Sequence, residues 1–303
     1  MRIEKVDDLI PLVSGRGKPA RLACAAPEDS ESLEALRMAA DAGIVQPLLV
    51  GRQKAIGTVA STLGISLDGF EFDDLPEQEE VARRAAQLVY EGHAAILMKG
   101  NLTTKGLIRA VLERDRISRN ERMLSHVALF DAPLLGKPII LTDAGVNIKP
   151  NLAQKIEIVK NAAEVSRRLG VKIPKVAMLA AVERVELPAM RATLDARMVE
   201  QMGDAGLLGE VAAQGPLALD DAVSPDVARL KALTGPVVGD ADILVAPEIE
   251  TANVLYKALT CFAQLEGASI IWGAHVPVVV PSRADSARTK LLSIAFAAAM
   301  IEE

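Results

Sequence analysis

Residues 94–114 read AAILMKGNLTTKGLIRAVLER, and this stretch decides the fold class. Ala94–Met98 is a short, continuous apolar run, which is typical of a buried strand. Gly100 then interrupts the run, and Thr103 and Thr104 stand just before a helical pattern over 106–114, as expected at a helix N-terminus. A strand that turns through a glycine into a helix is the repeating unit of α/β proteins with parallel sheets.

The same alternation of apolar runs and helical patterns continues on both sides of this segment. The runs predict strands at 21–26, 46–50, 137–142, 175–180, 242–247 and within 270–280. Apolar residues at helical spacing predict helices over 32–42, 77–91, 151–170, 189–202, 253–266 and 282–300. We therefore predict an α/β fold whose parallel or mixed sheets are covered by helices, with ligands beyond the carboxyl ends of the strands. The length and the turn Asp143-Ala144-Gly145 place a domain boundary near residue 145.

The composition excludes several classes of protein. Hydrophobic residues make up 50% of the 303 residues but aromatic residues only 3%, so we expect an aliphatic core. With 34 Lys and Arg against 40 Asp and Glu, the net charge of −6 disfavours nucleic-acid binding. The two cysteines exclude a disulfide framework, and the three histidines lack metal-ligand spacing, so no metal is expected. Because a signal-peptide core and a long apolar run are absent, we expect a cytoplasmic protein without membrane association.

Two basic segments offer groups that bind anions. The turn at 98–104 brings backbone N–H groups, two threonines and Lys99 to a helix start, which suits a phosphate. A plain helix N-cap without a ligand is the alternative there. Residues 109–122 hold five arginines against three acidic residues. This segment is either a polyanion-binding edge or a solvated helix with i,i+4 ion pairs.

Two further turns carry groups that are suited to catalysis. Ser282, Arg283 and Asp285 follow the strand that ends at Pro281. Arginine forks onto a phosphate, serine donates to an oxyanion, and aspartate acts as a base. The alternative is that Ser282 or Asp285 only caps the following helix. Asp143, at another strand end, either orients a neighbouring group or closes an Asx-turn.

Seven blocks of sequence give these turns a common context. In order they are MKGNLTTKGLIRAVL, LSHVALF, LTDAGVNIKPNLAQKIEIVKNA, PKVAMLA, GPLALDDAVSPDVARLKA, VVGDADILVAPEIETANVLYK and VPSRADSARTK. Their succession resembles the phosphate acetyltransferase and phosphate butyryltransferase family over nearly the whole chain, most closely over 94–300 and in the details of the butyryl branch. The chain also looks like the transferase part of larger proteins that carry an enoyl-CoA-hydratase-like domain.

The resemblance implies reversible transfer of an acetyl or butyryl group between coenzyme A and inorganic phosphate, in a ternary complex and without a covalent acyl-enzyme. It implies a two-domain fold similar to isocitrate and isopropylmalate dehydrogenases, with the site in the cleft and the last helix returning to the first domain. We therefore expect domains over 1–144 plus 283–303 and over 145–282. The family resemblance also implies a homodimer that needs no cofactor beyond its substrates, alone or with a hydratase-like partner domain.

The resemblance also assigns roles to single residues. Ser282 and Arg283 match the family's Ser-Arg pair near the thioester, and Arg109 matches an arginine implicated in substrate binding. The acetyl branch has a proposed aspartate base seven positions after that serine, where this chain has Thr289, so we take Asp285 as its substitute. The further candidates for substrate binding are Lys99, Asn101, Thr103, Thr104, Ser125, Asp143 and Asn253.

Other functions stay open at this point. An NAD-dependent dehydrogenase of the same fold needs an aspartate cluster for a divalent metal, and no such arrangement is evident, nor is there a Gly-x-Gly-x-x-Gly turn after a strand. An acyl phosphate transferase of lipid synthesis belongs to the same reaction class. A non-catalytic acyl-CoA-binding module is favoured only by Thr289 at the position of the base.

Overall fold

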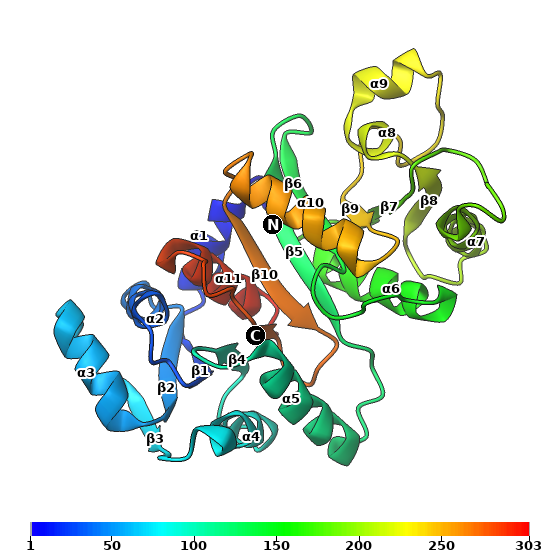
Figure 1. The fold of residues 1–303 in the computed structure, drawn as a ribbon. Helices are drawn as coiled ribbons and strands as arrows, with labels where there is room; N and C mark the ends of the chain where they lie inside the picture. Colours follow the sequence, from blue (N-terminus) through cyan, green and yellow to red (C-terminus); the bar gives the residue numbers. More distant parts are fainter. Residues whose placement is uncertain (1, 303) are drawn as a thin grey trace. The chain divides into compact units, whose positions relative to one another are not determined.

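The computed structural model describes residues 2–302, and the chain divides into two compact units. We call residues 7–122 and 268–302 the terminal unit, and residues 2–6 and 123–267 the central unit. Figure 1 shows the chain coloured by sequence: the terminal unit runs from blue to blue-green and again from orange to red, and residues 123–267 of the central unit run from green to orange. Both units are α/β, which confirms the predicted fold class.

The terminal unit is built on strands in the order β3-β2-β1-β4-β11-β10. All neighbours in this order are parallel except β10 and β11, which are antiparallel. Helix α2 packs on α11, as does α1, while α4 packs on α5 against the other side of β1 and β4 (Figure 1). The elements are η1 (Val6–Asp8), α1 (Leu9–Ser14), β1 (Ala20–Ala25), α2 (Ser30–Asp41), β2 (Val45–Gly51), α3 (Gln53–Leu63), β3 (Glu71–Asp74), α4 (Gln78–Tyr90), β4 (Ile96–Lys99), α5 (Thr104–Ser118), β10 (Gly267–Trp272), β11 (Val278–Val279) and α11 (Ala287–Ala299).

The central unit is built on strands in the order β5-β6-β9-β7-β8. Strands β5 and β6 form an antiparallel hairpin, and the remaining pairs are parallel. Helix α6 packs on β5, β6 and β9, α7 packs on β7 and β8, and α10 packs on β6. The elements are β5 (Ser125–Ala132), β6 (Lys137–Thr142), α6 (Leu152–Arg168), β7 (Lys175–Leu179), α7 (Arg191–Asp204), β8 (Ala212–Leu217), α8 (Leu219–Val223), α9 (Pro225–Leu230), β9 (Ile243–Val245) and α10 (Ile249–Cys261).

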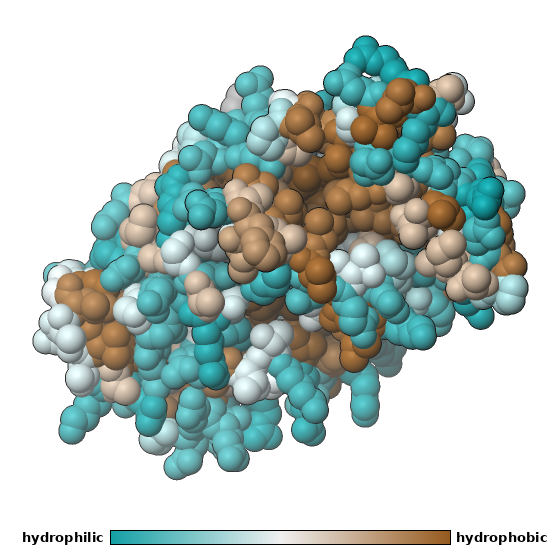
Figure 2. All heavy atoms as spheres, turned by 45° about the horizontal axis from the view of Figure 1, so that its top comes forward, coloured by the Kyte–Doolittle hydropathy of each residue, from teal (hydrophilic) through white to brown (hydrophobic). Residues whose placement is uncertain are grey.

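Aliphatic side chains form most of both cores, as the composition predicts. In the terminal unit Leu22, Leu49 and Leu97, from three neighbouring strands, are buried. In the central unit Phe130 packs edge-on against Tyr256 within a cluster that is otherwise Ala, Leu, Ile and Val. Figure 2 shows that hydrophobic side chains also reach the surface on the face in view, and Phe262, beyond α10, is 89% exposed.

Several boundaries differ from the sequence predictions, and the helix predicted over 253–266 spans Ile249–Cys261. The predicted helix over 282–300 begins at Ala287, because Ser286 is its N-cap and accepts the Thr289 N–H at 3.1 Å. The predicted strand within 270–280 is two antiparallel strands, β10 and β11. The predicted domain boundaries at 144/145 and 282/283 differ from those of the compact units at 122/123 and 267/268. The reason is strand pairing. Strand β6 pairs with both β5 and β9, so residues 123–142 belong with the central strands, whereas β11 pairs with both β10 and β4, so residues 268–282 belong with the terminal unit.

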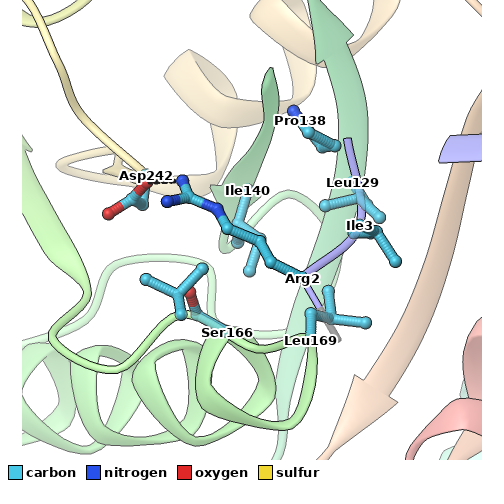
Figure 3. Close-up of a pocket in the computed structure, with 9 residues that line it drawn as sticks. Arg2, Ile3, Leu129, Pro138, Ile140, Ser166, Leu169 and Asp242 are labelled. Atoms are coloured by element: carbon cyan, nitrogen blue, oxygen red, sulfur yellow. Dashed lines mark hydrogen bonds and ion pairs between the residues drawn. The ribbon is translucent and has the colours of Figure 1, made fainter. Parts of the chain in front are cut away.

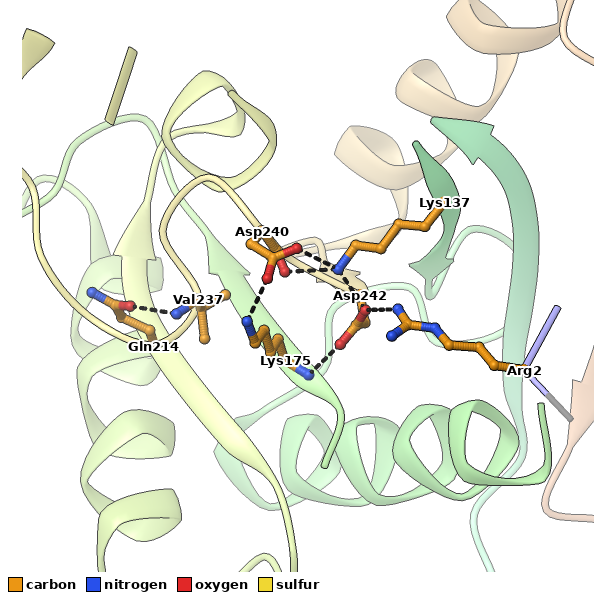
Figure 4. Close-up of polar contacts among 7 residues, drawn as sticks. All are labelled: Arg2, Lys137, Lys175, Gln214, Val237, Asp240 and Asp242. Carbon is orange, nitrogen blue, oxygen red and sulfur yellow. Dashed lines mark hydrogen bonds and ion pairs between the residues drawn. The ribbon is translucent and has the colours of Figure 1, made fainter. Parts of the chain in front are cut away.

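A network of ion pairs holds the amino ends of the central strands. Lys137 contacts both Asp240 and Asp242, at 2.7 and 2.6 Å, and Arg2 reaches Asp242 at 3.2 Å (Figure 4). The backbone N–H of Lys175 also donates to Asp242, at 3.0 Å. Figure 3 shows the Arg2 side chain running through a shallow pocket toward Asp242. These residues lie at the starts of β6, β7 and β9, so they are at the strand ends where ligands of α/β folds are not expected.

Among residues 2–302, none of the helices combines the length and the apolar character that crossing a bilayer requires.

Gly100 is the position where the fold tolerates a side chain least. A Cβ on Gly100 would lie 2.2 Å from the Ala26 carbonyl oxygen, and the backbone N–H of Gly100 already donates to Ala25 at 2.8 Å. We expect Gly100→Ala to lower the free energy of unfolding by about 1–3 kcal/mol, because overpacked backbone must shift. Chemical denaturation followed by circular dichroism measures this change.

Gly57→Ala is the matched control for this prediction. Gly57 lies inside α3, and a Cβ there meets nothing within 4 Å. We expect this substitution to raise the free energy of unfolding by about 0.5–1 kcal/mol, since alanine loses less backbone entropy in a helix. Equal effects of the two substitutions would contradict the role given to the Gly100 contact.

Candidate functional site

A cavity of about 150 Å³ lies in the terminal unit, at the carboxyl ends of β1, β4 and β11. These three strands are parallel neighbours, and their registers pair Ala25 with Lys99 and Met98 with Val279. Their ends therefore meet at one edge of the sheet, where α/β folds place ligands. The residues that line the cavity are Asp29, Glu31, Ser32, Lys99, Gly100, Asn101, Pro281, Ser282, Arg283 and Lys290.

Part of the cavity lining is an ion pair between the buried Lys290 and the half-buried Asp29. Lys290, on α11, is 3% exposed and contacts Asp29 at 2.9 Å and the Ser32 hydroxyl at 3.3 Å. Asp29 is also the N-cap of α2, because its carboxylate accepts the Ser32 N–H at 2.9 Å. Burial opposes the charged form of Asp29, but hydrogen bonds from Lys290 and Ser32 outweigh it and hold the pKa of this carboxyl below its usual range. The pair therefore fixes α2 against α11.

Lys99 is the second buried cation of the cavity. It ends β4, is 4% exposed, and donates to the carbonyl oxygens of Gly100 at 3.2 Å and Leu102 at 3.4 Å. Within residues 2–302, no carboxylate forms an ion pair with it. Burial lowers the pKa of Lys99, the charges of Lys290 and Arg283 lower it further, and Asp29 opposes this shift only in part.

The turn after β11 presents Ser282 and Arg283 to the cavity. Asp285 holds this turn, because its carboxylate accepts the Ser282 N–H at 2.8 Å and its own N–H donates to Ser282 at 3.2 Å. Arg283 is exposed and, in the described part of the chain, pairs with no carboxylate. Asp285 is not among the lining residues of this cavity within 2–302. Its carboxylate therefore orients Ser282 through the backbone.

Other predicted residues of the terminal unit serve α5. Thr103 is the N-cap of α5, because its hydroxyl accepts the Gly106 N–H at 3.2 Å, and Thr104 is the first helical residue. The Arg109 side chain is 79% exposed and pairs with Glu113 at 3.1 Å. The structure thus shows a helix cap at the threonines and an i,i+4 ion pair at Arg109, and brings neither to the lining of the cavity.

The central unit holds the three other predicted residues, at the carboxyl end of β6. The Asp143 carboxylate accepts the N–H groups of Gly145 and Val146, both at 2.9 Å, so it closes an Asx-turn. Asn253 reaches the same turn, donating to Ala144 at 3.2 Å. Ser125 is buried at the start of β5 and its hydroxyl accepts the Asn161 amide at 3.0 Å. Asp143 and Asn253 therefore stabilise the turn after β6, and Ser125 links the start of β5 to α6.

The sequence analysis missed the ion pair of Asp29 and Lys290. A signal for Asp29 was present, since Pro27 and Asp29 end a strand and precede a helix, as at the other turns. Lys290 also carried a signal, because it and Arg288 are the two charged residues of the last helix, which is otherwise mostly apolar. Both signals describe placement in the chain, and only the fold shows that α2 and α11 are neighbours.

In the described part of the chain, residues 2–302, no group of three or more His, Cys, Asp and Glu side chains is arranged to hold a metal ion.

Comparisons with known proteins relate this chain to a family. The family model described as phosphate acetyl/butaryl transferase matches residues 77–298. The phosphate butyryltransferase of Clostridium acetobutylicum is 39% identical over 296 residues, which cover 98% of each chain. The phosphate acetyltransferase of Thermotoga maritima is 36% identical over 293 residues, covering 97% of this chain and 98% of its own.

Solved structures show the same relationship. The branched-chain phosphotransacylase from Enterococcus faecalis superposes with a TM-score of 0.81 at 34% identity, covering 93% of this chain and 98% of its own. A putative 4-hydroxythreonine-4-phosphate dehydrogenase from Salmonella typhimurium has a TM-score of 0.60 at 11% identity, which shows a likeness of fold alone. Because the family model and these relatives extend over most of the chain, the protein belongs to the phosphate acetyl/butyryl transferase family.

Proposed function

We propose that this protein transfers a short acyl group, acetyl or butyryl, reversibly between coenzyme A and inorganic phosphate. One observation carries the proposal: Lys99 and Arg283 line the same cavity as Ser282, and neither cation pairs with a carboxylate among residues 2–302. A buried cation such as Lys99 is costly without a partner, and a phosphate compensates it, while the exposed Arg283 adds a second positive charge for the same anion. The family relationship supports the same chemistry.

Arg283 is the residue that we assign to the phosphoryl group. A guanidinium offers several N–H groups in a planar fork, which matches two oxygens of a phosphate. Asn101 and the backbone of Gly100 add further polar groups to the lining of the cavity. In the forward reaction the acyl phosphate places its phosphoryl group here, and phosphate leaves as an anion that Arg283 stabilises.

Ser282 is the residue that we assign to the oxyanion. In the described part of the chain its oxygen accepts the Ala284 N–H at 3.4 Å, and no acceptor takes its hydroxyl proton. That proton is free for the oxygen that becomes negative when sulfur adds to the carbonyl carbon. Loss of such a donor raises the barrier by about 3 kcal/mol. Direct attack by coenzyme A on the acyl phosphate needs no covalent acyl-enzyme, and holding both substrates together supplies much of the acceleration.

Two alternatives are weighed against this proposal. The likeness to a dehydrogenase rests on 11% identity and concerns the fold, whereas the transferase relatives match nearly the whole chain. A non-catalytic acyl-CoA-binding module is tested by the assay below. The homodimer, the absence of a further cofactor, the cytoplasmic location and an associated hydratase-like domain stay predictions from the family resemblance.

An assay with acyl phosphates of different chain length tests the proposed function. We expect coenzyme A and acetyl-, propionyl- or butyryl phosphate to give a thioester, measured by its ultraviolet absorbance, with release of one phosphate per thioester. The reverse reaction is expected to depend on inorganic phosphate. Binding of coenzyme A without thioester formation from any of the three acyl phosphates would favour the non-catalytic module and contradict the proposal.

Arg283→Ala tests where the phosphoryl group binds. We expect kcat/KM for the acyl phosphate to fall by about 100-fold or more, because a charged donor to the transition state is lost. Arg288→Ala is the matched control, since Arg288 lies on α11, pairs with Asp7 and does not line the cavity. We expect its kcat/KM to stay within about twofold of wild type, as for an exposed ion pair. Equal kcat/KM values for the two variants would contradict the assignment of Arg283 to phosphoryl binding.

A further inference from the structure

The reaction needs a group that accepts the thiol proton. The acetyl branch of the family has a proposed aspartate base at a position where this chain has Thr289. Only the thiolate of coenzyme A is a strong nucleophile, and a free thiol with a pKa of about 8.5 is mostly protonated near neutral pH. The Thr289 N–H donates to Ser286 and the two hydroxyls are 3.2 Å apart, so Thr289 belongs to the cap of α11. The following inference rests on the proposed function and asks which group takes the thiol proton.

The acidic groups of the cavity are committed to other contacts. Asp29 is bound by Lys290 and by the Ser32 N–H. Glu31 accepts the Ser30 hydroxyl at 2.8 Å, and hydrogen bonds from its own backbone N–H and from Ser30 lower the pKa of its carboxyl. Such carboxylates are weak bases, since their conjugate acids are strong.

Asp285 contributes to the turn that carries Ser282 and not to the lining of the cavity within residues 2–302. Its carboxylate accepts the Ser282 N–H at 2.8 Å. Asp285 therefore acts as a positioning residue that holds the turn of Ser282 in place. The base must therefore be sought among the remaining titratable groups of the lining.

The Lys99 amine has the geometry of a base that faces the cavity. A neutral amine carries two N–H groups and one lone pair. The two carbonyl oxygens of Gly100 and Leu102 accept two N–H groups, at 3.2 and 3.4 Å. The third position of the nitrogen is left without a protein partner among residues 2–302, and Lys99 lines the cavity beside Ser282.

We infer that Lys99 is the general base that deprotonates coenzyme A. The thiol proton moves to the Lys99 nitrogen while the sulfur forms a bond with the acyl carbon. The bond from that carbon to the phosphate oxygen breaks, and its electron pair leaves with the phosphate. The new ammonium lies in the same cavity as Arg283 and passes its proton to the phosphate or to water. In the reverse reaction the ammonium returns the proton to the departing thiolate.

The surroundings of Lys99 lower its pKa and so shift it toward the neutral form. Burial disfavours the ammonium, Lys290 and Arg283 repel it, and the Asp29 carboxylate, which attracts it, is already paired with Lys290. Cys24, on the neighbouring strand, is buried, and burial raises the pKa of its thiol, so it stays neutral. Because the pKa of Lys99 is shifted below 10.5, the base form is present at and above the lowered pKa. The rate is expected to fall as pH drops through that value.

The experiment measures single-turnover thioester formation against pH for wild type and for variants of the full chain. Lys99→Met removes the base, Lys99→Arg keeps a cation that is not a base near neutral pH, and Asp285→Asn keeps an oxygen for the Ser282 N–H. We expect both Lys99 variants to lose about 10²–10⁴-fold in rate, the usual contribution of a general base. Their residual rates should rise with hydroxide concentration, and Asp285→Asn should keep the acidic limb of the wild-type profile.

Lys54→Met is the matched control, because Lys54 is an exposed lysine on α3 outside the cavity, and it should behave as wild type. Recovery of the Lys99→Ala rate by added ethylamine is a further expected result, which a structural role of Lys99 would not give. Wild-type rates and pH profile in both Lys99→Met and Lys99→Arg would overturn the inference, as would loss of the acidic limb in Asp285→Asn alone. If wild type forms no thioester from any acyl phosphate, the proposed function fails instead.

Discussion

The site of this protein depends on the parallel alignment of β1, β4 and β11. Because the three strands run the same way, their carboxyl ends deliver Lys99, the backbone at Ala26 and the Ser282 turn to one edge of the sheet. The contact between Gly100 and Ala26 permits this arrangement, since it lets the chain leave β4 directly beside β1. The ion pair of Lys290 with Asp29 then joins α11 and α2 over the same edge.

Burial and charge at this edge are opposed, and that opposition gives the cavity its chemistry. Two of its cations, Lys99 and Lys290, are almost fully buried, but only Lys290 has a carboxylate partner among residues 2–302. A protein pays for such a group with stability, and groups of this kind concentrate at functional sites. A phosphate relieves the repulsion among the cations, while a neutral Lys99 avoids it. The neutral form of Lys99 can accept a proton, and its charged form can stabilise the phosphate anion that is released.

Local sequence patterns were sufficient to predict several strands and the turns that follow them. The strand and glycine turn at 94–100 are present as predicted, since a continuous apolar run followed by glycine has few alternatives. The same kind of pattern placed Ser282 and Arg283 after a strand, although the helix begins later, at Ala287. Strands β3, β5 and β8 escaped prediction. Strand β3 is short and half-exposed, β5 begins with the polar residues Ser125 and His126, and β8 is interrupted by Gly215 and Pro216. Such strands are stabilised by their neighbours rather than by their own pattern.

The site itself was predictable only as separate turns. The sequence indicates which residues stand at strand ends, but the assembly of Lys99 with Arg283 depends on contacts between residues far apart in the chain. The roles of Thr103 and Asp285 likewise required geometry, since cap and ligand use the same residue types.

The central claim is that this cavity holds the phosphoryl group beside Arg283 and Lys99. A crystal structure of the full chain with inorganic phosphate and an unreactive coenzyme A lacking the sulfur tests it most directly. We expect phosphate within hydrogen-bond distance of the Arg283 guanidinium and of Lys99 Nζ, next to the Ser282 hydroxyl. Phosphate bound elsewhere in the chain, with this cavity holding only water, would contradict it.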